Sequence, residues 1–400
     1  MSKKVMLLGG SKFIVPAIDV LHDLGYEVIT CDYLPGNLAH KYSDRYENLS
    51  VIDKDAVLKA AEEAGIEGIM SFACDPGVAT AAYVAQQMGL PSCGSYESVC
   101  ILQNKKRFRH FLMENGFNSP ASEGFFDIKD TKSFLERVSY PLIVKPADSA
   151  GSKGVSRVEK YSDLERAVRN ALERSIGGEF IIEEFLQQTG NPSDSECFSV
   201  EGDLRIATFS SQYFDDKSSN PYGPVGFTWR PTISEKHKTE LTGEICRLIK
   251  LLGMNTSLYN AETRECTDGK AYIMELSPRG GGNRLAEMIR YATGTDLIKA
   301  AVNAALGRSV DLTAKRENDG LWAEIILHGR KSGRYNGLII DEEIKRYVVE
   351  EDIWVTGGEK VMEYTGADRT LGTLILHFDD PEMIEKVMND PAEYVKVDIV

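Results

Sequence analysis

The chain has 400 residues and lacks any long apolar run. No segment approaches the roughly 20 consecutive apolar residues that a membrane-spanning helix needs, so we expect no membrane partner. The amino-terminal stretch MSKKVMLLGG carries two lysines, but its apolar part is too short for a signal peptide.

An excess of positive charge is also missing. The net charge is −15 at pH 7, and a nucleic acid or an anionic membrane requires a basic face on its partner. We therefore expect neither partner. Hydrophobic residues make up 42% of the chain and charged residues 27%, which is ordinary for a globular protein in water. The length allows two or three domains, each with its own core.

Paired cysteines are absent as well. The seven cysteines are scattered singly and form no CxxC motif. An odd, unpatterned set disfavours a disulfide framework and a zinc site, and it favours the reducing cytoplasm. A GxxxxGK[ST] phosphate loop is absent too.

The first hundred residues contain an alternation of strand and helix patterns. Buried-strand runs occur in KVMLLGG, YEVITCDY and GIEGIMSF, and residues 14–24, 55–64 and 76–88 have helical spacing. This alternation predicts a parallel sheet covered by helices. The turn Gly9-Gly10-Ser11 lacks the GxGxxG spacing, so a plain strand-to-helix turn is favoured over a dinucleotide site.

Later segments predict two further regions. The helix NKKRFRHFLMENG begins near Asn104 and ends at its glycine, a typical left-handed stop. Polar loops follow at 148–154, 187–195 and 215–226, and the last has the composition of a mobile lid. Beyond residue 312 the charged TAKREND marks a boundary, after which LWAEIILHG and RTLGTLILHF predict strands of a small α+β domain.

The run YIMELSPRGGGNR carries charged residues at the end of an apolar strand pattern. Upstream, Asp268-Gly269 lies between two strand-like runs, a strong signal for a hairpin with a two-residue type I′ turn. That turn places Glu262 opposite Glu275 and Asn260 opposite Ser277.

Strand alternation puts these four residues and Arg279 on one face of the hairpin. Two carboxylates directly opposite each other repel, and Mg²⁺ between them would turn the repulsion into coordination. The alternative is that both glutamates are solvated and neutralised by neighbouring arginines, and a bulge near the turn would separate them. The other face is expected to enter the core with Tyr259, Ala261, Tyr272, Met274 and Leu276.

Arg279 follows on the charged face, and its delocalised guanidinium suits bidentate contact with a phosphate. Gly280–Gly282 allow the backbone to approach a ligand closely, and they precede a helix expected near Asn283. Because a helix N-terminus attracts anions, we interpret this segment as a platform for a metal ion and a phosphate. The alternative is a glycine-rich strand-to-helix turn with a surface arginine.

With these motifs the chain resembles the ATP-grasp superfamily, in particular its carboxylate–amine ligases, which include L-amino-acid ligases and purine-pathway enzymes. The resemblance covers about residues 1–310. It implies α/β and α+β folds in three parts: an N-terminal parallel α/β (pre-ATP-grasp) domain at 1–104, a two-lobed ATP-grasp domain at 105–312 with its smaller lobe at about 118–186, and a small C-terminal α+β domain at 313–400.

The resemblance also implies an ATP site. NKKRFRHFL is similar to the family helix whose lysine reaches ATP, and YPLIVKP to the strand that ends in a second ATP lysine. DSAGSKG resembles the loop that closes over the phosphates, FIIEEFL the hinge that reads adenine, and the glutamate of SECFSV best fits a later ribose contact. The implied ATP contacts are Lys105, Lys145, Ser149, Gly151, Ser152, Gly154, Glu183, Phe185, Leu186 and Glu196.

The hairpin is the most specific match. The family places metal ligands on two strands, the second of which reads ExNxR. The implied ligands of Mg²⁺ (or Mn²⁺) are therefore Glu262 and Glu275. This sequence has Ser277 where most members have asparagine, and Asn260, expected opposite it, is near enough to help bind the metal.

In such enzymes a substrate carboxylate attacks the γ-phosphate of ATP to give an acyl phosphate and ADP, and an amine then displaces phosphate to form an amide. Arg279 with the amides of Gly281 and Gly282 would hold the acyl-phosphate oxygens. Arg284 and Arg230 are candidate contacts for the substrate carboxylate, although each could equally be a surface ion-pair partner. We expect small-molecule carboxylate and amine substrates in the cytoplasm, with a homodimer allowed.

Two alternatives stay open. One is a carboxylating or formyl-transferring ATP-grasp enzyme related to purine synthesis. The other is a catalytically silent ATP-binding scaffold, for which the serine at position 277 is the only hint. Phosphate release stimulated by amino acids would favour the ligase, whereas nucleotide binding without turnover would favour the scaffold.

Overall fold

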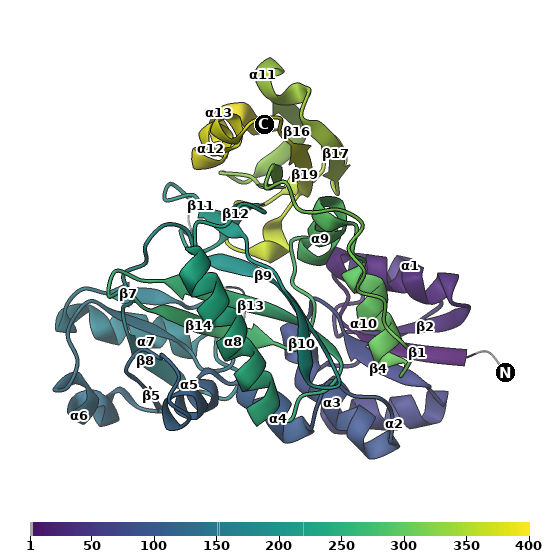
Figure 1. The fold of residues 1–400 in the computed structure, drawn as a ribbon, viewed down its shortest axis with the longest axis horizontal. Helices are drawn as coiled ribbons and strands as arrows, with labels where there is room; N and C mark the ends of the chain where they lie inside the picture. Colours follow the sequence, from purple (N-terminus) through teal and green to yellow (C-terminus); the bar gives the residue numbers. More distant parts are fainter. Residues whose placement is uncertain (1–2, 150, 152, 219) are drawn as a thin grey trace.

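A computed structural model describes residues 3–149, 151, 153–218 and 220–400. Figure 1 shows an N-terminal α/β region on one side, a smaller lobe on the opposite side, a central sheet between them, and the C-terminal strands and helices above. None of the helices in the described part of the chain combines the length and the apolar character that crossing a bilayer requires.

The N-terminal region is the predicted parallel sheet. Its strand order is β3-β2-β1-β4, and all of its pairs are parallel. Alternation along β1 sends Val5 and Leu7 to one face with α1, and Met6 and Leu8 to the other face with α2 and α3. The bounds are β1 Lys3–Leu8, α1 Val15–Asp23, β2 Tyr26–Cys31, β3 Arg45–Glu47, α2 Lys54–Ala64, β4 Gly68–Ser71 and α3 Asp75–Met88.

The smaller lobe is an antiparallel sheet of order β5-β8-β6-β7, with a core of its own under α6 and α7. Two helices lead into it from the N-terminal region, and Asn104 caps the second by accepting a hydrogen bond from the amide of Arg107 at 3.0 Å. The bounds are α4 Tyr96–Gln103, α5 Lys105–Glu114, β5 Ser122–Phe125, α6 Lys132–Leu135, β6 Leu142–Pro146, β7 Ser156–Val158, α7 Leu164–Leu172 and β8 Phe180–Glu184.

The central sheet is also antiparallel, with the order β10-β9-β13-β14. One face packs on α8 in an apolar cluster. The opposite face carries the charged residues of the hairpin. The bounds are β9 Ser193–Val200, β10 Asp203–Ala207, α8 Glu235–Leu251, β13 Ser257–Glu265 and β14 Ala271–Ser277.

The β13–β14 hairpin confirms the predicted pairing but not the predicted turn. Glu262 lies opposite Glu275, and Asn260 lies opposite Ser277. The turn is longer than two residues, because the amide of Cys266 donates to the carbonyl of Lys270 at 2.9 Å and residues 267–269 connect them. A bulge in β14 then restores the predicted register. The extra residue in the turn and the extra residue in the bulge therefore cancel at the glutamate pair.

The bulge changes which side chains face the core. Ala271 and Ile273 join the apolar cluster under α8, because the extra residue inverts the alternation between the turn and Glu275. The prediction that Met274 faces this core is therefore wrong, since Met274 lines a cavity on the charged face. Tyr272 is buried, but its hydroxyl donates to Asp268 at the turn.

The C-terminal strands share a sheet with an earlier hairpin. The order β11-β12-β15-β19-β17 joins residues on both sides of position 312, while the domain boundaries themselves stay a prediction. A smaller sheet has the order β18-β16-β20. The bounds are β11 Ser211–Phe214, β12 Pro224–Thr228, β15 Trp322–Leu327, β16 Gly333–Ile340, α11 Glu342–Lys345, β17 Val348–Ile353, β18 Lys360–Val361, β19 Gly372–His377, α12 Pro381–Asn389, α13 Pro391–Tyr394 and β20 Val395–Ile399.

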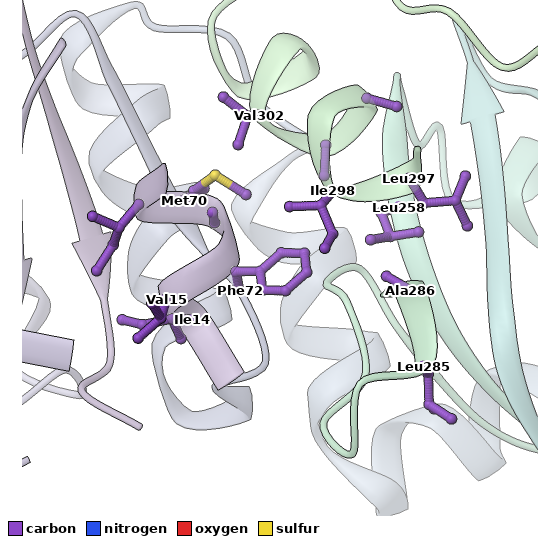
Figure 2. Packing of buried hydrophobic residues seen from close by; sticks show 14 of the residues in the cluster. Ile14, Val15, Met70, Phe72, Leu258, Leu285, Ala286, Leu297, Ile298 and Val302 are labelled. Carbon is purple, nitrogen blue, oxygen red and sulfur yellow. The ribbon is translucent and has the colours of Figure 1, made fainter. Parts of the chain in front are cut away.

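The N-terminal sheet is fixed to the central sheet by an apolar cluster. Figure 2 shows Met70 and Phe72, at the end of β4, beside Ile298 of helix α10 (Leu297–Ala305) and near the start of α9 (Leu285–Thr293). A Cβ on Gly280 would lie 2.6 Å from the Phe72 ring, so this turn has room only for glycine. The packing places the carboxyl ends of the N-terminal strands against the glycine-rich turn.

Candidate active site

A cavity lies between the smaller lobe and the central sheet; we call it the inter-lobe cavity. Its wall comes from β6, β8, the segment after β8, the loop after β6, and the charged face of β13 and β14. It brings together most of the implied ATP and metal residues: Lys105, Lys145, Ser149, Gly151, Glu183, Phe185, Leu186, Glu262 and Glu275. Ser152 lies outside the described residues.

Lys145 is held in this wall by a buried ion-pair network. The Nζ of Lys145 lies 2.7 Å from one oxygen of Glu183, and Arg109 donates its Nε to the other oxygen at 2.7 Å. Burial alone would raise the pKa of Glu183, but Arg109 and Lys145 lower it to about 2. Burial lowers the pKa of Lys145, and Glu183 opposes that shift. Glu183 therefore fixes the position of the lysine.

Arg109 is a functional candidate that the sequence interpretation missed. It is 1% exposed, and its Nη1 donates to the carbonyl of Met274 at 2.9 Å. It thus connects helix α5, strand β8 and strand β14 around the cavity. The available signal was an arginine on the apolar side of the helix NKKRFRHFL, where a charge needs a buried partner.

The start of α5 is tied to the glycine-rich loop. Lys105 donates from Nζ to the carbonyl of Ser149 at 2.6 Å, and its amide donates to the carbonyl of Ala147 at 2.8 Å. Gly151 lines the cavity with φ at +69°. Gly154 supports the loop from behind, because a Cβ there would lie 3.0 Å from Pro146 while φ is +75°.

The two glutamates of the hairpin differ in their partners. Glu262 accepts a hydrogen bond from Arg264 at 2.8 Å; burial alone would raise the pKa of Glu262, but this arginine lowers it. Within the described residues Glu275 has no hydrogen bond and no ion pair, and it lies open to the cavity. An unneutralised carboxylate beside a second carboxylate, about 5 Å away across the strand pair, suits a divalent cation.

A third carboxylate extends this row. Asp194 on β9 pairs with Glu262 on its other side, so Asp194, Glu262 and Glu275 occupy one rung of the sheet. Burial, with the nearby charge of Glu262, raises the pKa of Asp194 to about 7. Among the described residues, no three His, Cys, Asp or Glu side chains are grouped closely enough to hold a metal ion by themselves. A cation here would thus depend on two carboxylates and on oxygens of a ligand.

Asn260 and Ser277 have other partners. Asn260 donates to Asp194 at 2.6 Å. Ser277 donates to Asp75 at 2.9 Å and accepts from Gln103 at 2.7 Å. Both side chains are thus engaged within the protein, and their metal role stays a prediction.

Arg279 is occupied by a carboxylate of the chain itself. Its Nε and Nη2 donate to the two oxygens of Asp75 at 2.8 and 2.5 Å, and its Nη1 donates to the carbonyl of Gly280 at 2.9 Å. Burial would lower the pKa of Arg279, but Asp75 raises it. The arginine is 9% exposed and does not line the inter-lobe cavity in the described part of the chain.

The glycine-rich turn binds a buried glutamate. The amide of Gly281 donates to Glu196 at 2.7 Å, and a Cβ at this position would lie 2.9 Å from the same oxygen. Glu196 is fully buried, and burial raises its pKa to about 8. It pairs with Asn260 across the sheet and does not meet the hinge at Phe185, so the predicted ribose contact gains no geometric support. Gly282 follows, near the ring of Phe13.

The two candidate substrate arginines lie elsewhere. Arg284 donates to Glu287 at 2.8 Å and to Glu350 at 2.7 Å. Arg230 forms an exposed ion pair with Glu385 at 3.5 Å. Arg230 is thus in the surface ion pair that the sequence interpretation kept as the alternative, whereas the ion pairs of Arg284 are largely buried. Contact of either arginine with a substrate stays a prediction.

A second cavity adjoins the first; we call it the N-terminal cavity. It encloses about 600 Å³, and its outer wall is built from the carboxyl ends of β1, β2 and β4. The C-terminal segment contributes Asp368, which lies 4.0 Å from Lys153 of the glycine-rich loop. The two cavities share Lys105, Ser149, Gly151, Lys153 and Glu275.

The class of the domain that contains this cavity follows from a comparison with family models. Residues 138–287 match the family model of the ATP-grasp domain, so the chain carries an ATP-grasp domain. The resemblance seen in the sequence is confirmed at this level.

Curated relatives share part of the chain. The large chain of carbamoyl phosphate synthase from Thermoanaerobacter is 25% identical over 236 residues, which cover 58% of this chain and 21% of that protein. The counterpart from Thermotoga neapolitana is 25% identical over 296 residues, covering 72% of this chain and 26% of that protein. The chain thus spans about a fifth to a third of the length of the curated relatives that it matches.

Solved structures share the whole fold. An L-amino acid ligase from Bacillus licheniformis superposes with a TM-score of 0.80 at 21% identity, covering 100% of this chain and 99% of that chain. Phosphoribosylglycinamide synthetase from Anaerococcus prevotii gives 0.77 at 16% identity, and N5-carboxyaminoimidazole ribonucleotide synthetase from Thermotoga maritima gives 0.76 at 16% identity, each covering 100% of both chains.

Proposed function

We propose that the protein is an ATP-dependent carboxylate–amine ligase that forms an amide through an acyl phosphate and releases ADP and phosphate. One observation carries the proposal: Lys105, Lys145, Glu262 and Glu275, from four separate segments, line one cavity between two lobes. The similar structures include an L-amino acid ligase, which supports this reaction class.

The electrostatics of the inter-lobe cavity fit a nucleotide triphosphate with a divalent cation. Lys145, oriented by Glu183, and Lys105, tied to Ser149, present cations to phosphate oxygens. Glu262 and Glu275 would hold Mg²⁺, which supplies neutralisation of the charge on the phosphate oxygens. The amide of Gly151 and the neighbouring loop would exclude water from the reacting acyl group.

Arg279 is already paired with a carboxylate of the chain, Asp75. The Nε and Nη2 of this arginine both donate to Asp75. They can contact an acyl phosphate only if the side chain of Asp75 first moves away. We therefore assign the main contacts with the transferring phosphate to the two lysines and keep the arginine as a contact that depends on this change.

The test is phosphate release from ATP with Mg²⁺ and pooled amino acids. We expect release that depends on the added acids, together with formation of an amide product detectable by mass spectrometry. Nucleotide binding without release under all acid mixtures would overturn the ligase proposal and favour a silent scaffold. Wild-type protein with ADP in place of ATP serves as the control.

A further inference from the structure

Several polar groups lie together at the outer end of the N-terminal cavity. This end is formed where β1 and β2 stop, by Gly10, Ser11, Asp32 and Asn37. Crevices beyond the carboxyl ends of parallel strands are the usual ligand sites of such sheets.

Asp32 is a buried carboxylate that has no positive partner in the described part of the chain. It is 8% exposed, and its Oδ1 accepts hydrogen bonds from the amide of Leu34 at 2.7 Å and from Asn37 at 3.2 Å. Within the described residues its Oδ2 accepts no hydrogen bond, and no cation lies within ion-pair distance. One oxygen of this carboxylate is thus free to accept from a ligand, and a ligand with a positive charge would stabilise it.

Two independent observations point to a ligand at the same place. The Oγ of Ser11 is buried and has no hydrogen-bond partner among the residues that the structure describes, although such groups are nearly always satisfied in proteins. Ala73, which lines the cavity just after β4, has φ at +52°. A non-glycine residue in this region is strained, and such strain concentrates at functional sites.

The position of Asp32 also constrains the length of the substrate. In the sheet order β3-β2-β1-β4, strand β1 separates β2 from β4. Two inter-strand spacings amount to about 10 Å. Asp75, just after β4, contacts Arg279 beside the hairpin, whereas Asp32 follows β2. Asp32 is therefore about 10 Å from the β4 side of the cavity, where Asp75 contacts Arg279, and this separation favours a substrate longer than an α-amino acid.

We propose that Asp32 and Ser11 form a binding site for the positively charged amino group of a substrate whose reacting end lies at the wall shared with the inter-lobe cavity. The substrate is thus a carboxylate with a distal amine, as in an ω-amino acid or a short peptide. This proposal rests on the proposed function, because the reacting end is placed where the phosphate is transferred.

The binding test needs no turnover. Titration calorimetry with the Mg²⁺ complex of a non-hydrolysable ATP analogue would compare 6-aminohexanoate with hexanoate, which differ only in the terminal ammonium group. We expect the amine to bind about 10- to 100-fold more tightly, as for a charge-assisted hydrogen bond in a buried site. Asp32→Asn should remove this preference, because asparagine keeps the Oδ1 contacts and loses the charge. Asp23→Asn, on the exposed end of α1, is the matched control.

The kinetic test uses a series of ω-amino acids from glycine to 8-aminooctanoate. We expect KM to fall with length beyond β-alanine in the wild type and to become flat in Asp32→Asn, while the KM for ATP stays constant. Ser11→Ala should weaken the same preference by a smaller factor. Thermal melting of each variant shows whether it is folded.

The outcomes separate this inference from the proposed function. Equal binding of 6-aminohexanoate and hexanoate, or a preference that survives in Asp32→Asn, overturns the ammonium site. Tighter binding of a ribonucleoside than of the amine, lost in Asp32→Asn, also overturns it and identifies a diol site. Selective amine binding without any phosphate release upholds the site but defeats the ligase.

Discussion

The inter-lobe cavity and the N-terminal cavity share a wall but satisfy their charges differently. In the inter-lobe cavity Glu183 is neutralised by Arg109 and Lys145, and Glu262 is neutralised by Arg264. In the N-terminal cavity Asp32 and Ser11 have unfilled hydrogen-bonding capacity. Among the described residues, these two glutamates of the inter-lobe cavity are paired within the protein and Glu275, where a metal ion would bind, is not, whereas Asp32 of the N-terminal cavity has no charged partner.

This difference separates two tasks. A preformed network fixes the geometry of groups that act on every substrate, because their positions do not depend on what binds. Uncompensated groups instead gain most from the one ligand that completes them, and so they discriminate between substrates. The two cavities should therefore respond differently to substitution.

The largest effect is expected for Lys145→Met. Loss of this cation from the inter-lobe cavity should reduce phosphate release about 100- to 1,000-fold for every carboxylate substrate alike. Melting temperature must be followed, because Glu183 keeps only Arg109 as its partner. Lys129→Met, at an exposed lysine, is the control. A loss confined to substrates with an amino group would break the distinction between the cavities.

Glu275→Gln should show the next largest effect. Its comparison with Glu262→Gln distinguishes a residue in the wall shared by both cavities from one that lines the inter-lobe cavity alone. Both Glu275→Gln and Glu262→Gln should raise the Mg²⁺ concentration for half-maximal release, by about 10- to 100-fold. Of these two glutamates, Glu275 lines both cavities and Glu262 lines the inter-lobe cavity alone, so we expect a higher KM for the acid substrate in the Glu275 variant and not in the Glu262 variant. Equal changes of that KM in both variants would contradict the assignment.

The hairpin shows why much of the inter-lobe cavity was predictable. Strand alternation and a turn signal placed Glu262 opposite Glu275, and the pairing is observed. The prediction holds although the turn is one residue longer, because the bulge in β14 compensates. Between the turn and the bulge no compensation acts, and there Met274 was assigned to the wrong face.

The rest of the site depends on contacts that local patterns do not encode. Asp75 meets Arg279 across 204 positions of the chain, and Asp194 joins the glutamate rung only through the pairing of β9 with β13. Neither follows from periodicity or turn chemistry, because both depend on how separate sheets pack. Family motifs located the lysines, which lie at strand and helix ends, but they gave no information on the partners that hold them, the carboxylate of Glu183 for Lys145 and the carbonyl of Ser149 for Lys105.

Behind both cavities, Glu196 should affect stability and leave the kinetics unchanged. Burial raises its pKa to about 8 from an ordinary value of 4.5, so the folded state binds more protons between these values. Its contribution is present below about pH 4.5 and is lost as the pH rises through about 8. Glu196→Gln keeps the acceptor for Gly281 and removes the charge. Urea unfolding at pH 5 and pH 9 should show a decline with pH that is smaller in the variant by about 1 to 3 kcal/mol.

An identical pH dependence of unfolding in the variant and the wild type would show that Glu196 ionises in the folded protein as it does in the unfolded chain. A changed KM for ATP would instead place this carboxylate near the nucleotide, as the ribose prediction requires. Either result would contradict the purely structural role that we assign to Glu196.

The smallest effect is expected for Ser277→Ala, which tests whether this serine supports the N-terminal cavity or contacts the metal ion in the inter-lobe cavity. Its hydroxyl donates to Asp75 and accepts from Gln103, so its loss should loosen the N-terminal cavity by about 1 kcal/mol, roughly fivefold in KM for the acid substrate. The Mg²⁺ requirement should stay constant, and Ser133→Ala on the exposed face of α6 is the control. If the Mg²⁺ requirement rises instead, with the KM for the acid unchanged, Ser277 acts as a metal contact despite its partners, and the serine belongs to the inter-lobe cavity after all.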